Sequence, residues 1–240
     1  MKNKVRYACI AEADKLSRSP VANLTSNTSG HFPYSFNCLK KFLNEKTLSF
    51  CLRIFRMCVC LELRMALDLT TRRLQLTQVR SEDWEEYYPI ISAPETSAHS
   101  DLPRAPTEKR ARGFVDWMVR LSQQSKGFAW MVRDVETREL LGCIRLNSID
   151  KRASVAVIGY EFGKPFWGNG YATETLIVVT KHCHQVMNLY RLEAWTLAGN
   201  LASGRVLTNA GFRYEGTQRR KMIIGRQRFD MRLFGRLADD

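Results

Sequence analysis

Apolar residues follow two different spacings along residues 68–240. In some stretches they alternate with polar residues, as in strands, and in others they recur every three or four residues, as in helices. The strand-like stretches predict strands at 71–79, 128–134, 140–148, 153–162 and 190–197, with a closing hairpin of 222–224 and 229–235. The helical spacing predicts one helix that opens at Ser81 and further helices at 110–123, 171–188 and 201–209. Residues 92–108, which contain three prolines, are predicted to form a loop.

The predicted helix 171–188 has one apolar stripe, typical of a helix that packs on a core. The stripe consists of Ala172, Leu176, Val179, Cys183 and Val186. His182 and His184 lie two residues apart in the same helix, so their side chains diverge by about 200° and cannot bind one metal ion. We expect both histidines at the surface or its boundary, and we expect no metal site.

The first 66 residues do not follow these patterns. Residues 17–37 are rich in Ser, Asn, Thr, Gly and Pro and predict a loop or disorder, and residues 38–63 would form a helix without a single apolar face. We therefore divide the chain into an N-terminal extension, 1–66, and one domain, 67–240. Either Met65 is the natural start and the preceding stretch is an upstream translation artefact, or the extension is a genuine docking arm or targeting segment. Glu12 and Asp14 argue against a transit peptide, which would be poor in acidic residues.

The chain has a formal net charge of +13, which suits acidic partners such as CoA phosphates, RNA or a ribosome surface. No run of Lys and Arg with interleaved aromatic residues occurs, so we expect no dedicated nucleic-acid site. No Cys-x-x-Cys pair occurs, so we expect no zinc ribbon. The apolar stretch 48–63 is interrupted by Arg53 and Arg56 and is too short to span a bilayer. With no evident signal peptide, we predict a cytoplasmic protein that does not bind membranes.

A glycine-rich turn at residues 163–170 joins a predicted strand to a predicted helix. Glycine permits a positive φ and a close backbone approach, and amides at a helix start bind anions. No Gly-Lys-Ser/Thr follows, which excludes a Walker loop, and Thr173 stands where a dinucleotide fingerprint needs a third glycine. The turn either binds a phosphorylated ligand or is an ordinary strand-to-helix connection.

The segment Trp167-Gly168-Asn169-Gly170-Tyr171-Ala172 resembles the acetyl-CoA loop of the GNAT N-acetyltransferase superfamily. Trp in its first position resembles the branch that acetylates the N-termini of ribosomal proteins (RimJ/RimL-like). The resemblance spans about 68–240 and includes Leu69–Leu74, Ile158–Tyr160, Asn200–Ser203, Gly211-Phe212 and the pair Gly225 and Asp230. It implies an α+β fold, in which a mixed, mostly antiparallel sheet carries helices on both faces and has a splayed central strand pair.

The resemblance also implies how acetyl-CoA is bound. The co-substrate would lie in the gap between the splayed strands. The backbone of Tyr160 and Phe162 would run along its pantetheine arm, and Asn200 would hydrogen-bond that arm. The pyrophosphate would be held by the amides of Trp167, Gly168, Asn169, Gly170, Tyr171 and Ala172.

For catalysis, the resemblance implies direct transfer of the acetyl group to an amine. Many family members place a Tyr acid where this chain has Leu207, and some place a Glu base where it has Met222. Ser203 is then the candidate to hydrogen-bond the CoA sulfur, unless it only caps a helix beside Asn200. Glu161 is an alternative base on the opposite strand face from Tyr160, or it is a solvated or ion-paired residue. Arg205, similarly, either contacts a CoA phosphate or is a surface arginine.

These observations predict an enzyme that acetylates a primary amine, most specifically the α-amine of a protein such as a ribosomal protein. A small amine, such as an aminoglycoside or a polyamine, is the alternative acceptor. A non-catalytic CoA-binding module is the alternative outside the enzyme class. The sequence is compatible with a monomer or a homodimer.

Overall fold

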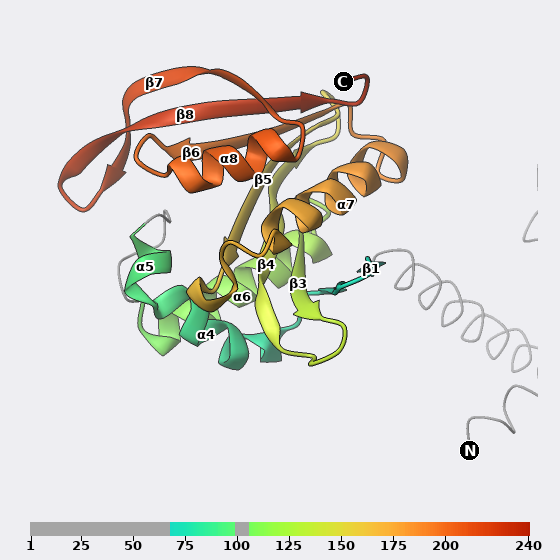
Figure 1. Ribbon diagram of the computed structural model, residues 1–240, viewed down its shortest axis with the longest axis vertical. Helices are drawn as coiled ribbons and strands as arrows, with labels where there is room; N and C mark the ends of the chain where they lie inside the picture. Colours follow the sequence, from blue (N-terminus) through green and yellow to red (C-terminus); the bar gives the residue numbers. More distant parts are fainter. Residues whose placement is uncertain (1–67, 99–105) are drawn as a thin grey trace, which may run out of the picture. The chain divides into compact units, whose positions relative to one another are not determined.

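The computed structural model describes residues 68–98 and 106–240, and the predicted extension 1–66 lies outside the described residues. An eight-stranded sheet organises the described part, in the order β1-β2-β3-β4-β5-β6-β8-β7 (Figure 1). Every neighbouring pair is antiparallel except β5 and β6. The strands are β1 Leu69–Thr70, β2 Leu74–Gln78, β3 Phe128–Asp134, β4 Leu140–Asp150, β5 Val155–Phe162, β6 Arg191–Leu197, β7 Arg213–Ile224 and β8 Gln227–Leu237.

Helices cover both faces of the sheet. On one face lie α4 and α6, and on the other lie α7 and α8. The long helices are α4 Trp84–Ser92, α6 Glu108–Gln123, α7 Tyr171–Gln185 and α8 Leu201–Asn209, and the short ones are η2 Ser81–Asp83, α5 Pro94–Ser97 and η3 Lys164–Phe166. None of the helices in these described ranges is long and apolar enough to cross a membrane.

Strand β3 shows how side-chain alternation separates the two cores. Trp130 and Val132 point to the core that includes Leu176 of α7, whereas Ala129 and Met131 point to the core beneath α4 and α6. Since successive side chains of a strand point to opposite faces, one strand serves both layers. The sandwich of helices around a mixed sheet confirms the predicted fold class.

The central pair β5 and β6 is joined over a short distance. Val155–Val157 pairs with Arg191–Glu193 in parallel, and beyond these residues the two strands continue to Phe162 and Leu197 without pairing to each other. The predicted splayed pair is therefore confirmed. The split leaves the backbone of both strands facing a gap between α7 and α8.

Several predicted boundaries agree with the structure, and others shift for local reasons. The helix 201–209 and the strand 128–134 are confirmed. The strand predicted at 71–79 is β2 and starts at Leu74, because the amide of Leu74 donates to the Thr71 side chain in a turn, 2.9 Å. The predicted loop 92–108 contains the short helix α5, which Pro94 opens. The helix predicted to end at 188 stops at Gln185, and the closing hairpin is longer than predicted.

The surface position predicted for His182 is wrong. Its side chain is buried, and its ring meets Trp130 edge-on with the centroids 6.1 Å apart. Burial lowers the pKa of this imidazole. His182 therefore belongs to the core that α7 forms with the sheet.

Candidate active site

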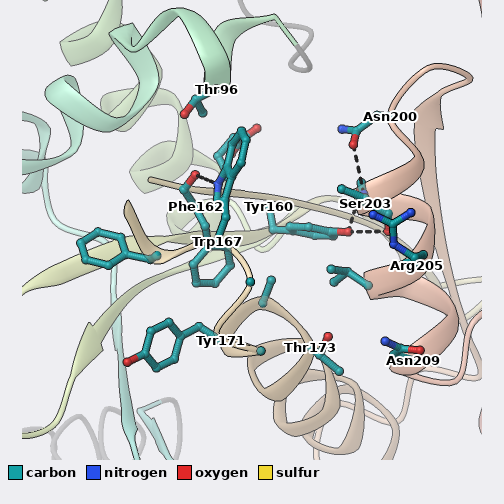
Figure 2. A pocket seen from close by; sticks show the side chains of 17 residues that line it. Thr96, Tyr160, Phe162, Trp167, Tyr171, Thr173, Asn200, Ser203, Arg205 and Asn209 are labelled. Atoms are coloured by element: carbon teal, nitrogen blue, oxygen red, sulfur yellow. Dashed lines mark hydrogen bonds between the residues drawn. The ribbon is translucent and has the colours of Figure 1, made fainter. Parts of the chain in front are cut away.

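A cavity of about 480 Å³ lies where β5 and β6 part, between the start of α7 and α8 (Figure 2). This volume falls in the usual range for small-molecule sites. All the predicted site residues except Asn169 line it. The lining also includes residues that the sequence did not single out, namely Thr96, Phe166, Thr173, Ala202, Val206 and Asn209. Thr96 lies on α5, far from the motifs along the chain, so no local pattern marked it.

The glycine-rich turn has the backbone that an anion cradle needs. Gly168 and Gly170 have φ values of +79° and +78°, a region that favours glycine. Gly170 is the N-cap residue of α7, and no side chain caps this helix. The amides of the first helical turn, from Tyr171 to Thr173, therefore have no intrahelical acceptor. Together with the helix dipole, amides of this kind can bind a phosphate group.

Trp167 contributes to the turn in a different way than the motif implies. Its amide donates to the carbonyl of Lys164, 3.1 Å, so this amide is already used within the protein. Its indole Nε1 donates to the carbonyl of Phe162, 2.7 Å, and both residues line the cavity (Figure 2). The tryptophan thus fastens the turn to the end of β5, and the phosphate cradle consists of the amides that follow it.

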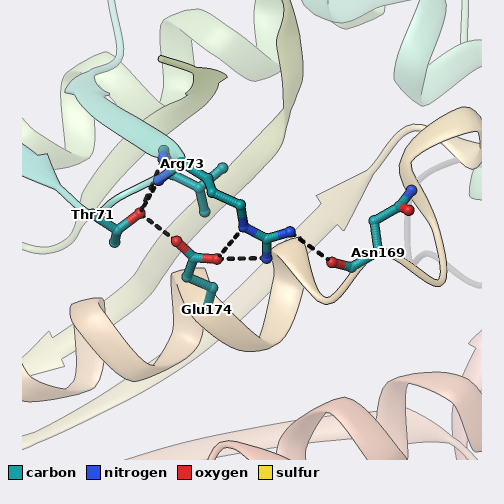
Figure 3. Close-up of polar contacts among 5 residues, drawn as sticks. Thr71, Arg73, Asn169 and Glu174 are labelled. Atoms are coloured by element: carbon teal, nitrogen blue, oxygen red, sulfur yellow. Dashed lines mark hydrogen bonds and ion pairs between the residues drawn. The ribbon is translucent and has the colours of Figure 1, made fainter. Parts of the chain in front are cut away.

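An arginine far away in the sequence holds the same turn (Figure 3). Arg73, between β1 and β2, donates from Nε and Nη2 to Glu174 Oε2 at 2.8 and 2.6 Å, and from Nη1 to the carbonyl of Asn169 at 3.1 Å. Its guanidinium also lies 4.6 Å from the centroid of the Tyr171 ring. The Arg73–Glu174 pair therefore ties the cradle to the opening strands, a contact that the sequence analysis did not predict.

Glu174 of this pair is held in its charged form. Burial raises its pKa, but hydrogen bonds from Thr71 and Arg73 outweigh burial, so the pKa is lower than usual. Asn169 lies outside the cavity lining. Its carbonyl accepts from Arg73, and its side chain donates to the carbonyl of Trp167, 3.3 Å.

In the middle of the cavity, β5 and α8 meet through two hydroxyls. The Tyr160 hydroxyl lies 2.7 Å from Ser203 Oγ and 3.2 Å from the carbonyl of Ser203 (Figure 2). Asn200 caps α8, because its Oδ1 accepts from the amide of Ser203, 3.0 Å. Asn200 thus does the capping, and Ser203 Oγ is engaged with Tyr160. Burial raises the pKa of the Tyr160 phenol, so this hydroxyl stays protonated at neutral pH.

Glu161 lies in a buried polar cluster on the other face of β5. Arg145 donates to both carboxylate oxygens of Glu161, with Nη2 at 2.9 Å from Oε1, and the Tyr87 hydroxyl donates to Oε2 at 3.0 Å. Phe114 of α6 lies against the Arg145 guanidinium, 5.1 Å from ring centroid to Cζ. Among the two interpretations of Glu161, the structure therefore shows the ion-paired arrangement.

The charges in this cluster reinforce one another. Burial lowers the pKa of Arg145, but the neighbouring Glu161 carboxylate more than offsets this, so the guanidinium stays charged. Burial, and then the Glu161 charge, raise the pKa of Tyr87. Glu161 thus lies between a cation and a neutral phenol.

The two positions at which this chain departs from the family motif do not reach the cavity. Leu207, in α8, is fully buried in the core that α8 shares with α7 and the sheet. Met222 lies in β7 opposite Phe229. Neither residue lines the cavity.

A family model described as an acetyltransferase (GNAT) domain matches residues 73–213. The chain belongs to the GNAT acetyltransferase family. This domain covers the cradle, the Tyr160–Ser203 pair and the splayed strands. The chain is therefore an N-acetyltransferase that uses acetyl-CoA, and the cradle and split strands described above fit a phosphorylated ligand with a long arm.

Individual relatives support the same activity. YoaA, an uncharacterized N-acetyltransferase of Bacillus subtilis, is 28% identical over 166 residues, which cover 69% of this chain and 94% of that protein. The ribosomal protein uS5-alanine N-acetyltransferase of Escherichia coli is 24% identical over 170 residues. The match covers 66% of this chain and 84% of the Escherichia coli enzyme. Among solved structures, RimL, a ribosomal L7/L12 α-N-protein acetyltransferase in complex with coenzyme A, superposes with a TM-score of 0.65 at 18% identity. That match covers 71% of this chain and 97% of the RimL chain.

Proposed function

We propose that this N-acetyltransferase transfers its acetyl group to the N-terminal α-amine of a protein, such as a ribosomal protein. The names of two relatives support this acceptor, since one acetylates the alanine of uS5 and the other the α-amine of L7/L12. The motif Trp-Gly-x-Gly-Tyr-Ala supports it as well.

The proposal rests on the small number of side chains around the cavity that could accept a proton from the amine. Among the described lining residues, Glu161 is the sole carboxylate and no His, Cys or Lys occurs. Glu161 is engaged by Arg145. A peptide α-amine has a pKa near 8 and a lysine amine one near 10.4, so at neutral pH the α-amine is uncharged roughly two hundred times more often. A site without an unengaged base is suited to the amine that loses its proton more easily.

The residues present fit the donor in three places. The amides from Tyr171 to Thr173 would hold the pyrophosphate, and Arg205 at the cavity rim would add a positive charge. The open edge of β5 around Tyr160 would take the pantetheine arm as an additional strand. When bound, acetyl-CoA supplies the thioester whose acetyl group is transferred.

Ser203 and Tyr160 act on the leaving sulfur in this proposal. Either hydroxyl can be the donor in the Tyr160–Ser203 contact, and in this proposal Tyr160 donates, which leaves the serine proton for the cavity. The serine then donates a hydrogen bond where negative charge develops as the carbon–sulfur bond breaks. Because burial raises the pKa of Tyr160, the phenol keeps its proton and stabilises this charge by hydrogen bonding. The pair would take the place of the tyrosine acid that Leu207 replaces.

Glu161 has a different role in this proposal. Its carboxylate fixes Arg145 and Tyr87 beneath the end of β5. The catalytic role that the sequence suggested for it stays a prediction. Its engaged oxygens favour a positioning role, in which it supports the backbone that the amine approaches.

The test compares two peptides of one composition. The first has a free N-terminal Ala, Ser or Thr and no lysine, and the second has a blocked N-terminus and one internal lysine. Release of CoA thiol, measured with a thiol reagent, is expected to be faster with the first peptide. Turnover of an aminoglycoside or a polyamine without turnover of the first peptide would move the acceptor to small molecules. Binding of acetyl-CoA without turnover of any amine would favour a non-catalytic module.

A further inference from the structure

The β7–β8 hairpin carries a dense group of positive charges. Residues 219–228 contain no Asp or Glu, and their cationic side chains are all exposed. Within the described residues none of these cations forms an ion pair. We call this group the hairpin cations; it consists of Arg219, Arg220, Lys221, Arg226 and Arg228.

Three of the hairpin cations are displayed by a bulge with a defined structure. Gln218 pairs with Met231 and Met222 pairs with Phe229, so three residues of β7 stand opposite Asp230 alone. Arg220, in the middle of the bulge, has φ +53°, a region that non-glycine residues rarely adopt. Its amide donates to Asp230 Oδ1, 2.7 Å, which holds this conformation. The bulge therefore presents three consecutive cations from a fixed backbone.

Hydrogen bonds connect the bulge to one end of the cavity. The carbonyl of Asp230 accepts from the amide of Ala198, 3.0 Å, and Asn200, two residues later, lines the cavity. Figure 2 shows Asn200 at the end of the cavity opposite Thr173 and Asn209, which lie by the start of α7. The hairpin cations are therefore attached near the end of the cavity away from the residues that start α7.

We propose that the hairpin cations bind acidic side chains of the acceptor, so that the enzyme prefers proteins whose N-terminal segment is rich in Asp and Glu. The inference rests on the proposed function and adds a substrate class to it. Exposed charges attract an oppositely charged partner and mainly affect encounter and binding. The preference should therefore appear in KM, with little change in kcat, and should weaken with added salt.

The test uses three peptides that share a free N-terminus and the first two residues. The following residues are rich in Glu, in Gln or in Lys, and each peptide carries a fluorophore at its C-terminus. At low ionic strength we expect kcat/KM for the Glu peptide to exceed that for the Gln peptide by about fivefold, since each exposed charge pair contributes little. The double variant Arg219→Glu/Lys221→Glu should abolish this ratio. Lys151→Glu/Arg152→Glu is the matched control, because it makes the same charge change in the β4–β5 turn, at the other end of the sheet.

The outcomes separate the inference from the proposed function. Equal kcat/KM for the Glu and Gln peptides in the unaltered enzyme, or a preference that survives in the hairpin variant, would overturn the inference. Fluorescence anisotropy measures binding of the Glu peptide without turnover, so hairpin-dependent binding with no acetylation would reject the α-amine acceptor and support the docking surface. Hairpin-dependent binding of poly(U) RNA without a preference for the Glu peptide would assign the surface to nucleic acid and overturn the inference.

Discussion

The Tyr160 hydroxyl lies 2.7 Å from Ser203 Oγ, and this contact joins β5 to α8 across the candidate active site. The two residues are separated by 43 positions in the sequence. Either hydroxyl can be the donor, and when the serine oxygen accepts from Tyr160 it can still donate its own proton.

Ser203→Ala should lower kcat by about tenfold to a hundredfold, because it removes a hydrogen-bond donor that acts on the leaving sulfur. Tyr160→Phe should lower kcat by a similar factor, and the double variant should be little worse than either single one, since both act through one contact. Steady-state kinetics with a free-N-terminus peptide measures these values. Tyr190→Phe is the control, since Tyr190 is exposed and its hydroxyl contacts Asp239. Losses that multiply in the double variant would show that the two hydroxyls act independently.

Arg73→Ala should weaken acetyl-CoA binding about fivefold, roughly 1 kcal/mol, because the cradle loses its tie to the opening strands. Titration calorimetry measures this dissociation constant, and the KM for the acceptor should stay unchanged. The exchange Arg73→Glu/Glu174→Arg should recover part of the affinity. Arg72→Ala is the control, since this neighbouring arginine is also exposed, while the contacts to Glu174 and Asn169 come from Arg73. Equal acetyl-CoA affinities of the Arg72 and Arg73 variants would contradict a role of Arg73 in holding the cradle.

The Arg73–Glu174 pair also predicts a pH dependence of stability. The pKa of Glu174 is lower in the folded protein than its ordinary value of 4.5, so the pair stabilises the fold above that value. The contribution is lost as the pH falls from 4.5 through the lower folded pKa. The difference in melting temperature between the unaltered protein and Glu174→Gln should therefore shrink over this acidic range. A difference that stays constant there would mean that the charge on Glu174 does not stabilise the fold.

Glu161→Gln should destabilise the protein by about 3 kcal/mol, because it removes the counter-charge of a buried guanidinium. Differential scanning calorimetry should show a melting temperature lower by roughly 10 °C. Glu193→Gln is the control, since Arg191 keeps its second partner Glu215. Glu161→Gln could instead melt normally and lose the rise of kcat with increasing pH that a general base produces. Glu161 would then be the catalytic base and not a positioning residue.

Gly170→Ala should cost about 1 kcal/mol or more of stability and should weaken acetyl-CoA binding, because Gly170 has φ +78°. A Cβ there would meet its nearest neighbour, Arg73 Nη2, at an ordinary 3.7 Å, so the effect is expected from the backbone and not from a clash. Gly113→Ala, in α6, has no neighbour within 4 Å and no positive φ, and it should leave binding unchanged. Unaltered acetyl-CoA affinity in the Gly170 variant would remove this turn from the binding site.

The sequence predicted those parts of the site that depend on local chemistry. Glycine spacing marked the turn with its positive φ values, and the resemblance to the GNAT family marked Asn200 and Ser203 at the start of α8. The bounds of the helix after Asn200 were predicted as 201–209 and are those of α8.

Contacts between distant elements could not be predicted in this way. Arg73 and Glu174 lie 101 positions apart, and a single sequence does not say which arginine faces which carboxylate. The same holds for Tyr160, where the motif suggested a backbone role and the structure adds a hydroxyl contact. His182 was misplaced because helix periodicity gives the direction of a side chain, but the presence of Trp130 beneath it depends on the packing of α7 on the sheet.

The short ladder between β5 and β6 leaves two strand edges without a strand partner inside the fold. A continuous sheet has two edges, but this one adds two more inside the fold, where β5 and β6 run on past Val157 and Glu193. Unpaired strand edges attract other chains, and proteins commonly cover them. Here residues of α7 and α8 line the cavity beside β5. The place proposed for the donor is thus also a place where strand edges lie inside the fold rather than at the ends of the sheet.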